Sequence, residues 1–177
     1  TVRLHTGDPS LYGAIREQMD RLDELGIKYD ICPGVSSFCG AAAALRAEYT
    51  LPDVSQTVII TRMAGRTPVP EKESIAALAA HNATMVIFLS TGLLKELSAE
   101  LIRGGYKPDT PAAIVYKASW ADQKVCRCTV DDLAQTASDN GITKTALICV
   151  GYFLGNDYSL SKLYDKSFET EFRKAEI

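Results

Sequence analysis

The stretch LHTGDPSLYG, residues 4–13, decides the fold, because it joins an apolar strand expected at residues 2–4 to a helix expected beyond a tight turn. Gly7 removes a side chain where a ligand could approach the backbone, and Pro9 suits a first helical turn. Asp8 can either cap the free N–H groups of that helix or reach a ligand. In an open α/β fold, such a turn lies at the carboxyl edge of the sheet, where ligands bind.

A second turn of the same design follows in PGVSS, residues 33–37. It comes after an expected strand at residues 28–32 and opens an alanine-rich helix at residues 37–46. Ser36 or Ser37 can cap this helix, and its free N–H groups and positive dipole end suit a ligand carboxylate. Two glycine-containing turns so close together predict one shared small-molecule crevice.

The rest of the chain alternates between strand and helix patterns. Apolar stripes at helical spacing predict helices, and uniformly apolar runs predict buried strands. The link at residues 118–120 is short enough for its two flanking strands to pair antiparallel. The sequence therefore predicts an α/β fold with a mixed sheet. Strands are expected at residues 57–61, 84–89, 112–116, 124–129 and 145–150, and helices at 14–25, from 71, at 91–103, from 129, and in the tail at 158–172.

Composition narrows the class of protein. The chain has 177 residues, is 46% hydrophobic and 23% charged, and carries a formal net charge of −3, as expected for a globular protein. The sequence has no cluster of basic residues of the kind that binds nucleic acid, and it has no apolar run long enough to span a bilayer. The five cysteines include no C-x-x-C pair, and there are only two histidines. We therefore expect reduced thiols, a cytoplasmic location and no metal site.

Several motifs resemble one family. GDPxxYG at residues 7–13 and PGVSS at residues 33–37 are similar to hallmarks of the tetrapyrrole (corrin/porphyrin) methylases, and DTPAAIV at 109–115 and ALICVG at 146–151 also fit. This resemblance implies the tetrapyrrole methylase fold and a methyltransferase that uses S-adenosylmethionine and releases S-adenosylhomocysteine. It further implies a polycarboxylate tetrapyrrole as substrate and a homodimeric enzyme.

Two further stretches resemble one branch of that family. TRMAGRTPVPE at residues 61–71 and SKLYDKSFETEFR at residues 161–173 are similar to the branch that methylates C11 of precorrin-4 or cobalt-precorrin-4 in cobalamin biosynthesis. One alternative is a sibling enzyme that acts at another corrin position or on uroporphyrinogen III. Another is a non-catalytic fragment that only binds a ligand. The motifs leave open whether the substrate contains cobalt.

One family feature is missing. The resemblance leads us to expect an amino-terminal strand and a G-x-G-x-G-D loop, and neither occurs in the 177 residues. We therefore expect residues 1–34 to be the end of an amino-terminal domain and residues 35–177 to be the carboxy-terminal domain. This departure leaves open whether the fragment alone is active.

The resemblance also implies which residues contact the cofactor, and the polycarboxylate substrate suggests which residues contact the tetrapyrrole. No nucleophile or general base is assigned. Arg62 and Arg66 are expected to line the substrate trough, because guanidinium groups bind carboxylates in bidentate fashion. The alternative is a solvated loop whose arginines bind backbone carbonyls, and Lys117 and Arg127 are weaker candidates of the same kind. The expected cofactor contacts are Thr6, Gly7, Asp8, Leu11, Ser36, Ser37, Leu89 and Ala118.

Overall fold

The computed structural model describes residues 1–161, 165, 167–169, 171 and 173–174. Its centre is a five-stranded sheet in the order β1-β2-β5-β3-β4. β1 and β2 pair in parallel, and the other three pairs are antiparallel. The expected mixed sheet is therefore confirmed. The strands are β1 (Val58–Arg62), β2 (Thr84–Phe88), β3 (Pro111–Tyr116), β4 (Lys124–Thr129) and β5 (Ala146–Val150).

The strand directions create one edge at which several strand ends meet. β5 lies between β2 and β3 and is antiparallel to both, with Val86 opposite Cys149 and Ala113 opposite the same residue. The carboxyl ends of β2 and β3 therefore lie beside the amino end of β5. The β3–β4 hairpin extends from the same edge, and its antiparallel pairing is as predicted.

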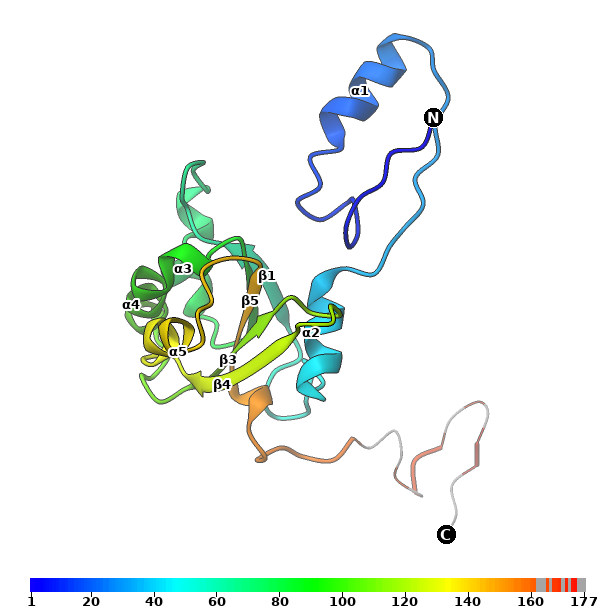
Figure 1. Ribbon diagram of the computed structural model, residues 1–177. Coiled ribbons are helices and arrows are strands. Elements are labelled where there is room, and N and C mark those ends of the chain that lie inside the picture. Colours follow the sequence, from blue (N-terminus) through cyan, green and yellow to red (C-terminus); the bar gives the residue numbers. More distant parts are fainter. Residues whose placement is uncertain (162–164, 166, 170, 172, 175–177) are drawn as a thin grey trace.

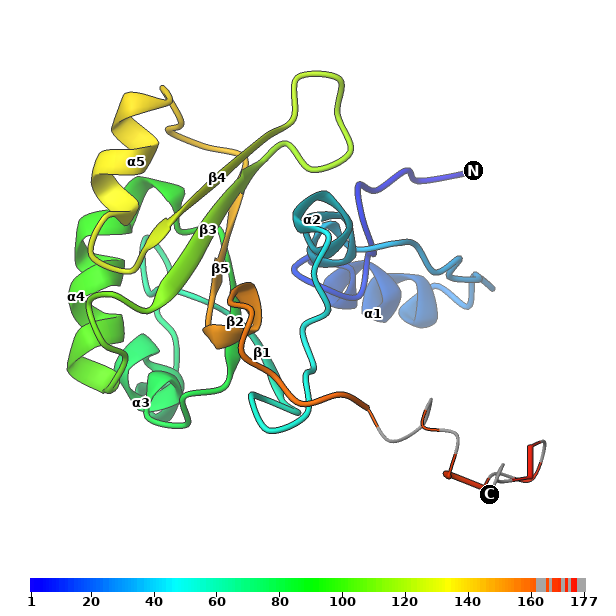
Figure 2. The ribbon, with the colours of Figure 1, turned by 90° about the horizontal axis from the view of Figure 1, so that it is seen from below.

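Helices cover both faces of the sheet (Figures 1 and 2). Because successive side chains of a strand point to opposite faces, Met85 and Ile87 of β2 pack on one side and Val86 on the other. The side with Met85 and Ile87 is covered by three helices and the opposite side by one. The three are α3 (Ile75–Ala79), α4 (Leu94–Gly104) and α5 (Leu133–Asp139), and the fourth is α2 (Ser37–Leu45).

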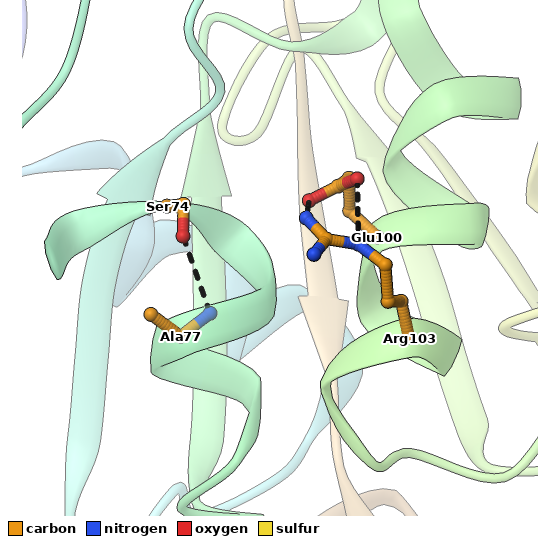
Figure 3. Close-up of polar contacts among 4 residues, drawn as sticks. All are labelled: Ser74, Ala77, Glu100 and Arg103. Carbon is orange, nitrogen blue, oxygen red and sulfur yellow. Dashed lines mark hydrogen bonds and ion pairs between the residues drawn. The ribbon is translucent and has the colours of Figure 1, made fainter. Parts of the chain in front are cut away.

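Short 3₁₀ turns precede two of the predicted helices. η1 (Glu71–Glu73) leads into α3, and η2 (Thr91–Leu93) leads into α4. Figure 3 shows the junction at α3, where the Ser74 hydroxyl accepts a hydrogen bond from the Ala77 N–H at 3.4 Å. It also shows the exposed Glu100–Arg103 ion pair of α4.

Gly104 ends α4 against α3. A Cβ at this position would lie 2.5 Å from both the Ala76 carbonyl oxygen and the Ala79 Cβ, closer than side chains allow. Glycine is thus needed here because the two helices approach so closely. A further 3₁₀ turn, η3 (Tyr152–Leu154), follows β5 and places Phe153 in the core beneath α2.

Residues 1–34 form an arm that does not join the sheet (Figure 1). The strands predicted at residues 2–4 and 28–32 are wrong, because a strand needs a hydrogen-bonded neighbour and none pairs with these segments among the described residues. Val2 and Leu4 are 83% and 89% exposed. The predicted first helix is present as α1 (Arg16–Glu24), but it buries no residue. The arm meets the sheet domain at Tyr12, whose ring lies 5.3 Å from that of Phe88.

The carboxy-terminal tail differs from expectation where it is described. The helix predicted at residues 158–172 is not formed by residues 158–161. Residues 162–164, 166, 170 and 172 of that prediction lie outside the described residues. Within the described part of the chain, no helix combines the length and apolar character that crossing a membrane requires.

Candidate functional site

A cavity of about 700 Å³ opens at the sheet edge where β2, β3 and β5 meet, a size typical of small-molecule sites. The sheet contributes Phe88, Leu89 and Val115, and the start of β5 contributes Leu147. The turns of the arm, the start of α2 and the loop at residues 117–120 between β3 and β4 form most of the remaining wall. The two glycine-containing turns, at residues 4–13 and 33–37, thus lie against strand ends that come much later in the sequence.

The structure brings all eight expected cofactor residues to this one cavity. The prediction of a shared crevice between the two glycine-containing turns is confirmed in its geometry, and the contacts of these residues with a cofactor stay a prediction. The eight are Thr6, Gly7, Asp8, Leu11, Ser36, Ser37, Leu89 and Ala118.

Asp8 has a role that neither sequence interpretation anticipated. One carboxylate oxygen accepts a hydrogen bond from the Ser10 N–H at 2.8 Å and another from the Ser10 hydroxyl. The other oxygen accepts from the Gly34 N–H at 2.8 Å. These bonds, the Ser10 hydroxyl first, hold the pKa of Asp8 below its usual value. No helix starts directly after Asp8, because α1 begins only at Arg16. The carboxylate therefore ties the first turn to the second.

The two turns also pack backbone against backbone. Gly7 has a φ of +65°, and a Cβ there would lie 3.6 Å from the Cα of Ser36 and the nitrogen of Ser37. A Cβ on Gly34 would collide with the Gly7 carbonyl oxygen. Glycine is therefore needed at position 34 by the close approach of the two turns and at position 7 by the left-handed backbone.

The amino end of α2 lies in the cavity wall. Ser36 is the residue before the helix, it is buried, and its side chain makes no capping hydrogen bond. The first N–H groups of a helix have no partner within the helix, and they attract negative or electron-rich groups. Ser36 and Ser37 therefore present backbone donors where a carboxylate or hydroxyl could accept them.

Left-handed backbone is concentrated around the cavity. Among the described residues, nine that are not glycine have positive φ, and five of these line the cavity. Such a conformation costs on the order of 1–3 kcal/mol per residue and is common at ligand sites. The five are Tyr12 (φ 57°), Leu89 (53°), Lys117 (46°), Ser119 (72°) and Thr145 (57°).

The two arginines expected at the substrate do not line the cavity. The Arg62 guanidinium donates to the carbonyl oxygens of Met63 at 3.1 Å, Thr67 at 3.2 Å and Pro68 at 2.8 Å. It thereby shapes the loop at residues 63–70. This is the alternative named above, in which the arginine binds backbone carbonyls of its own loop. Arg66 is exposed in that loop, and its side chain has no hydrogen bond or ion pair with the described residues.

The two weaker candidates for the substrate site, Lys117 and Arg127, lie in different surroundings. Arg127 donates to the Leu45 carbonyl at 2.9 Å and the Leu154 carbonyl at 3.2 Å, so it joins β4 to the end of α2 and to η3. Lys117, in contrast, lines the cavity.

Sequence reasoning missed several residues of the cavity wall, above all Tyr12 and Trp120. An aromatic residue in a link between two strands is a signal that could have found Trp120. Among the described residues, no group of three or more His, Cys, Asp or Glu is placed to hold a metal ion.

Comparison with known proteins adds independent findings. The sequence model of the Tetrapyrrole (Corrin/Porphyrin) Methylases matches residues 1–134. The chain is 57% identical over 175 residues to a protein of Methanocaldococcus jannaschii named cobalt-precorrin-4 C(11)-methyltransferase, and this match covers 98% of the chain and 68% of that relative.

Solved structures agree with this match. An X-ray structure of a cobalt precorrin-4 methyltransferase superposes with a TM-score of 0.85 at 51% identity, covering 88% of this chain and 65% of that one. A uroporphyrin-III C-methyl transferase of Thermus thermophilus, solved in complex with S-adenosyl homocysteine, shares the fold with a TM-score of 0.66 at 20% identity, over 84% of this chain and 64% of that one. The chain thus spans about two thirds of the length of the relatives that it matches.

Proposed function

Because this chain belongs to the tetrapyrrole (corrin/porphyrin) methylase family, we propose that it methylates C11 of precorrin-4 or cobalt-precorrin-4 with S-adenosylmethionine, in cobalamin biosynthesis. The observation that carries the proposal is the 57% identity to a relative of that name across 98% of the chain. The cavity at the meeting point of the strand ends supports it, because all eight residues expected for the cofactor line it.

The cavity has the chemistry that this cofactor needs. Backbone N–H groups at the start of α2 suit its carboxylate, and Gly7 leaves space for a close approach. Apolar walls at Phe88, Val115 and Leu147 suit its adenine. We propose that Thr6, Leu11, Leu89 and Ala118 complete the contact, and that Asp8 holds the two turns at the spacing the cofactor requires.

The reaction needs alignment more than it needs a protein nucleophile. When bound, S-adenosylmethionine supplies a methyl group that is activated by the positive charge on its sulfur. As the new carbon–carbon bond forms, the methyl–sulfur bond breaks and the sulfur becomes the neutral thioether of S-adenosylhomocysteine. The protein contributes by orienting the two reactants and excluding water. We propose that the left-handed backbone of Leu89, Lys117 and Thr145 gives the cavity wall the shape that this alignment needs.

We propose that the loop at residues 63–70 carries substrate recognition. Arg62 shapes it through three carbonyl bonds, and Arg66 keeps an exposed guanidinium for a substrate carboxylate. Arg66→Gln should raise the KM for the tetrapyrrole roughly tenfold, since hydrogen bonds to charged groups contribute about 1.5 kcal/mol. S-adenosylhomocysteine should bind unchanged. Arg21→Gln on α1, an exposed arginine paired with Glu24, is the matched control. An unchanged KM in Arg66→Gln would remove Arg66 from the substrate site.

We also propose that residues 1–34 belong to an amino-terminal domain and residues 35–177 to a carboxy-terminal one, in a cytoplasmic homodimer. The absence of buried residues in α1 supports the division. Five free cysteines support a reducing compartment, and the dimer rests on the family resemblance. Light scattering after size exclusion tests the dimer.

The deciding experiment incubates the natural full-length protein with S-adenosylmethionine and cobalt-precorrin-4. Mass spectrometry should show one added methyl group, and NMR should place it on C11. If S-adenosylhomocysteine binds but this substrate is not methylated, a sibling substrate such as uroporphyrinogen III is tested next. Binding without methylation of any tetrapyrrole would indicate a protein that only binds ligand, and no binding at all would refute the proposal.

A further inference from the structure

Trp120 is an exposed aromatic side chain at a binding cavity. It is the single tryptophan of the 177 residues, it lies in the loop between β3 and β4, and it lines the cavity. Its side chain is nevertheless 57% exposed. Aromatic side chains are common in the walls of ligand sites, and a half-exposed ring here offers apolar area that a bound ligand can cover.

The loop that carries Trp120 is held in place by hydrogen bonds. The Lys117 N–H donates to the Thr145 carbonyl at 2.9 Å, which fixes the loop to the start of β5. The Trp120 N–H donates to the Lys117 carbonyl at 3.0 Å, and the Gln123 N–H donates to the Trp120 carbonyl at 3.1 Å. The Gln123 side chain accepts from the Ser119 N–H at 2.7 Å. The indole is therefore positioned before any ligand arrives, which lowers the entropic cost of binding.

A lysine supports the indole. The Lys117 ammonium lies 5.2 Å from the centroid of the Trp120 ring and 5.1 Å from that of Tyr116. Asp122 holds the same ammonium at 2.5 Å. Cation–π contacts of this kind stabilise the orientation of the ring, so the exposed part of the indole stays directed by its neighbours rather than by solvent.

Trp120 lies in a part of the cavity wall that follows the end of β3. The strand ends of β3 and β5 contribute Val115 and Leu147, next to the polar residues Lys117, Ser119 and Thr145. The start of α2 contributes backbone N–H donors at Ser36 and Ser37 to the same cavity. The loop with Trp120 follows β3 directly and is bonded to the residue before β5. A ligand whose charged end binds the backbone donors at the start of α2 can present a flat heteroaromatic end to the indole.

From the exposed, pre-positioned indole in the cavity wall we infer that Trp120 stacks on the adenine of the cofactor and is a specificity-determining residue for the adenosyl group. The inference rests on the proposed function, since it assumes that S-adenosylmethionine occupies this cavity. Base–aromatic stacking contributes on the order of 1–3 kcal/mol, so loss of the ring should weaken binding roughly 5- to 150-fold.

The test measures affinities of the natural full-length protein by titration calorimetry. S-adenosylhomocysteine and methylthioadenosine, which carries adenine but no amino-acid end, are the two probes. Trp120→Ala should lose the same factor for both probes, whereas Trp120→Phe should recover most of the affinity. Tyr158→Ala removes another exposed ring that does not line the cavity and is the matched control. Tryptophan fluorescence should change on binding in the wild type, and that part of the signal should be absent in Trp120→Phe.

The outcomes separate the two proposals. If the wild type binds neither probe, the proposed function itself fails. If the wild type binds and Trp120→Ala binds equally well, the inference about Trp120 is overturned. An unchanged affinity for both probes together with a raised KM for the tetrapyrrole would also overturn it, because Trp120 would then contact the substrate. If Trp120→Ala does not fold, Trp120→Leu decides the question, since it keeps the apolar volume without a ring to stack.

Discussion

Replacing Gly34 with alanine should disable the cavity while leaving the sheet domain folded. The backbone at Gly34 has no positive φ, so alanine meets no conformational penalty there. The added Cβ, however, would overlap the Gly7 carbonyl oxygen far inside 3.0 Å, a limit that real Cβ atoms essentially never cross, and it would lie 3.1 Å from the Gly7 carbonyl carbon. Both neighbours are backbone atoms, so no side chain can rotate away. The two turns must separate instead.

The size of the effect follows from that separation. Relieving the overlap needs a shift of roughly 1 Å, which misaligns the backbone donors of the second turn; two hydrogen bonds to a charged ligand group, at about 1.5 kcal/mol each, correspond to about 10²-fold in affinity. The same shift lengthens the bond from the Gly34 N–H to Asp8, now 2.8 Å. We expect the Kd for S-adenosylhomocysteine to rise by about two orders of magnitude. The melting temperature should fall by less than about 2 °C, because α1 buries no residue and the core lies elsewhere.

Calorimetric titration and thermal unfolding measure the two quantities on the same samples. Gly92→Ala is the matched control, because Gly92 lies beside the cavity residue Thr91 and a Cβ there meets nothing within 4 Å. Wild-type affinity in Gly34→Ala would refute the proposed packing of the two turns. A large drop in melting temperature would refute the claim that the arm adds little to global stability.

Three further predictions concern single side chains. Hydrogen bonds lower the pKa of Asp8. The bond from the Gly34 N–H to this carboxylate should therefore persist above the usual carboxyl pKa and weaken as pH falls through the lowered value. Cofactor binding measured against pH should show this acid-dependent loss in the wild type and not in Asp8→Asn. Arg127→Lys should lower the melting temperature by about 2–4 °C and leave the substrate KM unchanged, because lysine cannot keep both carbonyl bonds, including the one to Leu45 at 2.9 Å. Gly104→Ala should destabilise the fold by about 1–3 kcal/mol in urea unfolding, because its Cβ would lie 2.5 Å from the Ala76 carbonyl oxygen; normal stability would contradict the close approach of α3 and α4.

The sheet domain could be predicted from the sequence because its signals are local. Uniformly apolar runs became β2, β3 and β5 within a residue or two of the expected bounds. The short link at residues 118–120 correctly indicated an antiparallel hairpin. A strand also depends on its neighbour, however, and this is why residues 2–4 and 28–32 have strand-like composition but form no strand here.

The cavity could be predicted only in part. The two glycine-containing turns correctly predicted that Gly7, Ser36 and Ser37 meet at one crevice, although the strands expected before them do not form. The positions of Leu89 and Ala118 came from the family resemblance alone, since each reads as an ordinary core residue. The bonds of Arg62 to its own loop depend on where residues 67 and 68 fold back, which composition does not reveal.

The left-handed residues around the cavity have a consequence for protein engineering. A mutational library that varies Leu89, Ser119 or Thr145 would sample side chains and backbone shape at the same time, because β-branched and bulky residues resist positive φ whereas Asn, Asp and Gly accept it. Val115 and Leu147 line the same cavity from regular strands, where exchange for another apolar residue leaves the backbone in place. Altered ligand preference should therefore evolve most readily through these two strand positions, with the left-handed corners acting as a fixed frame.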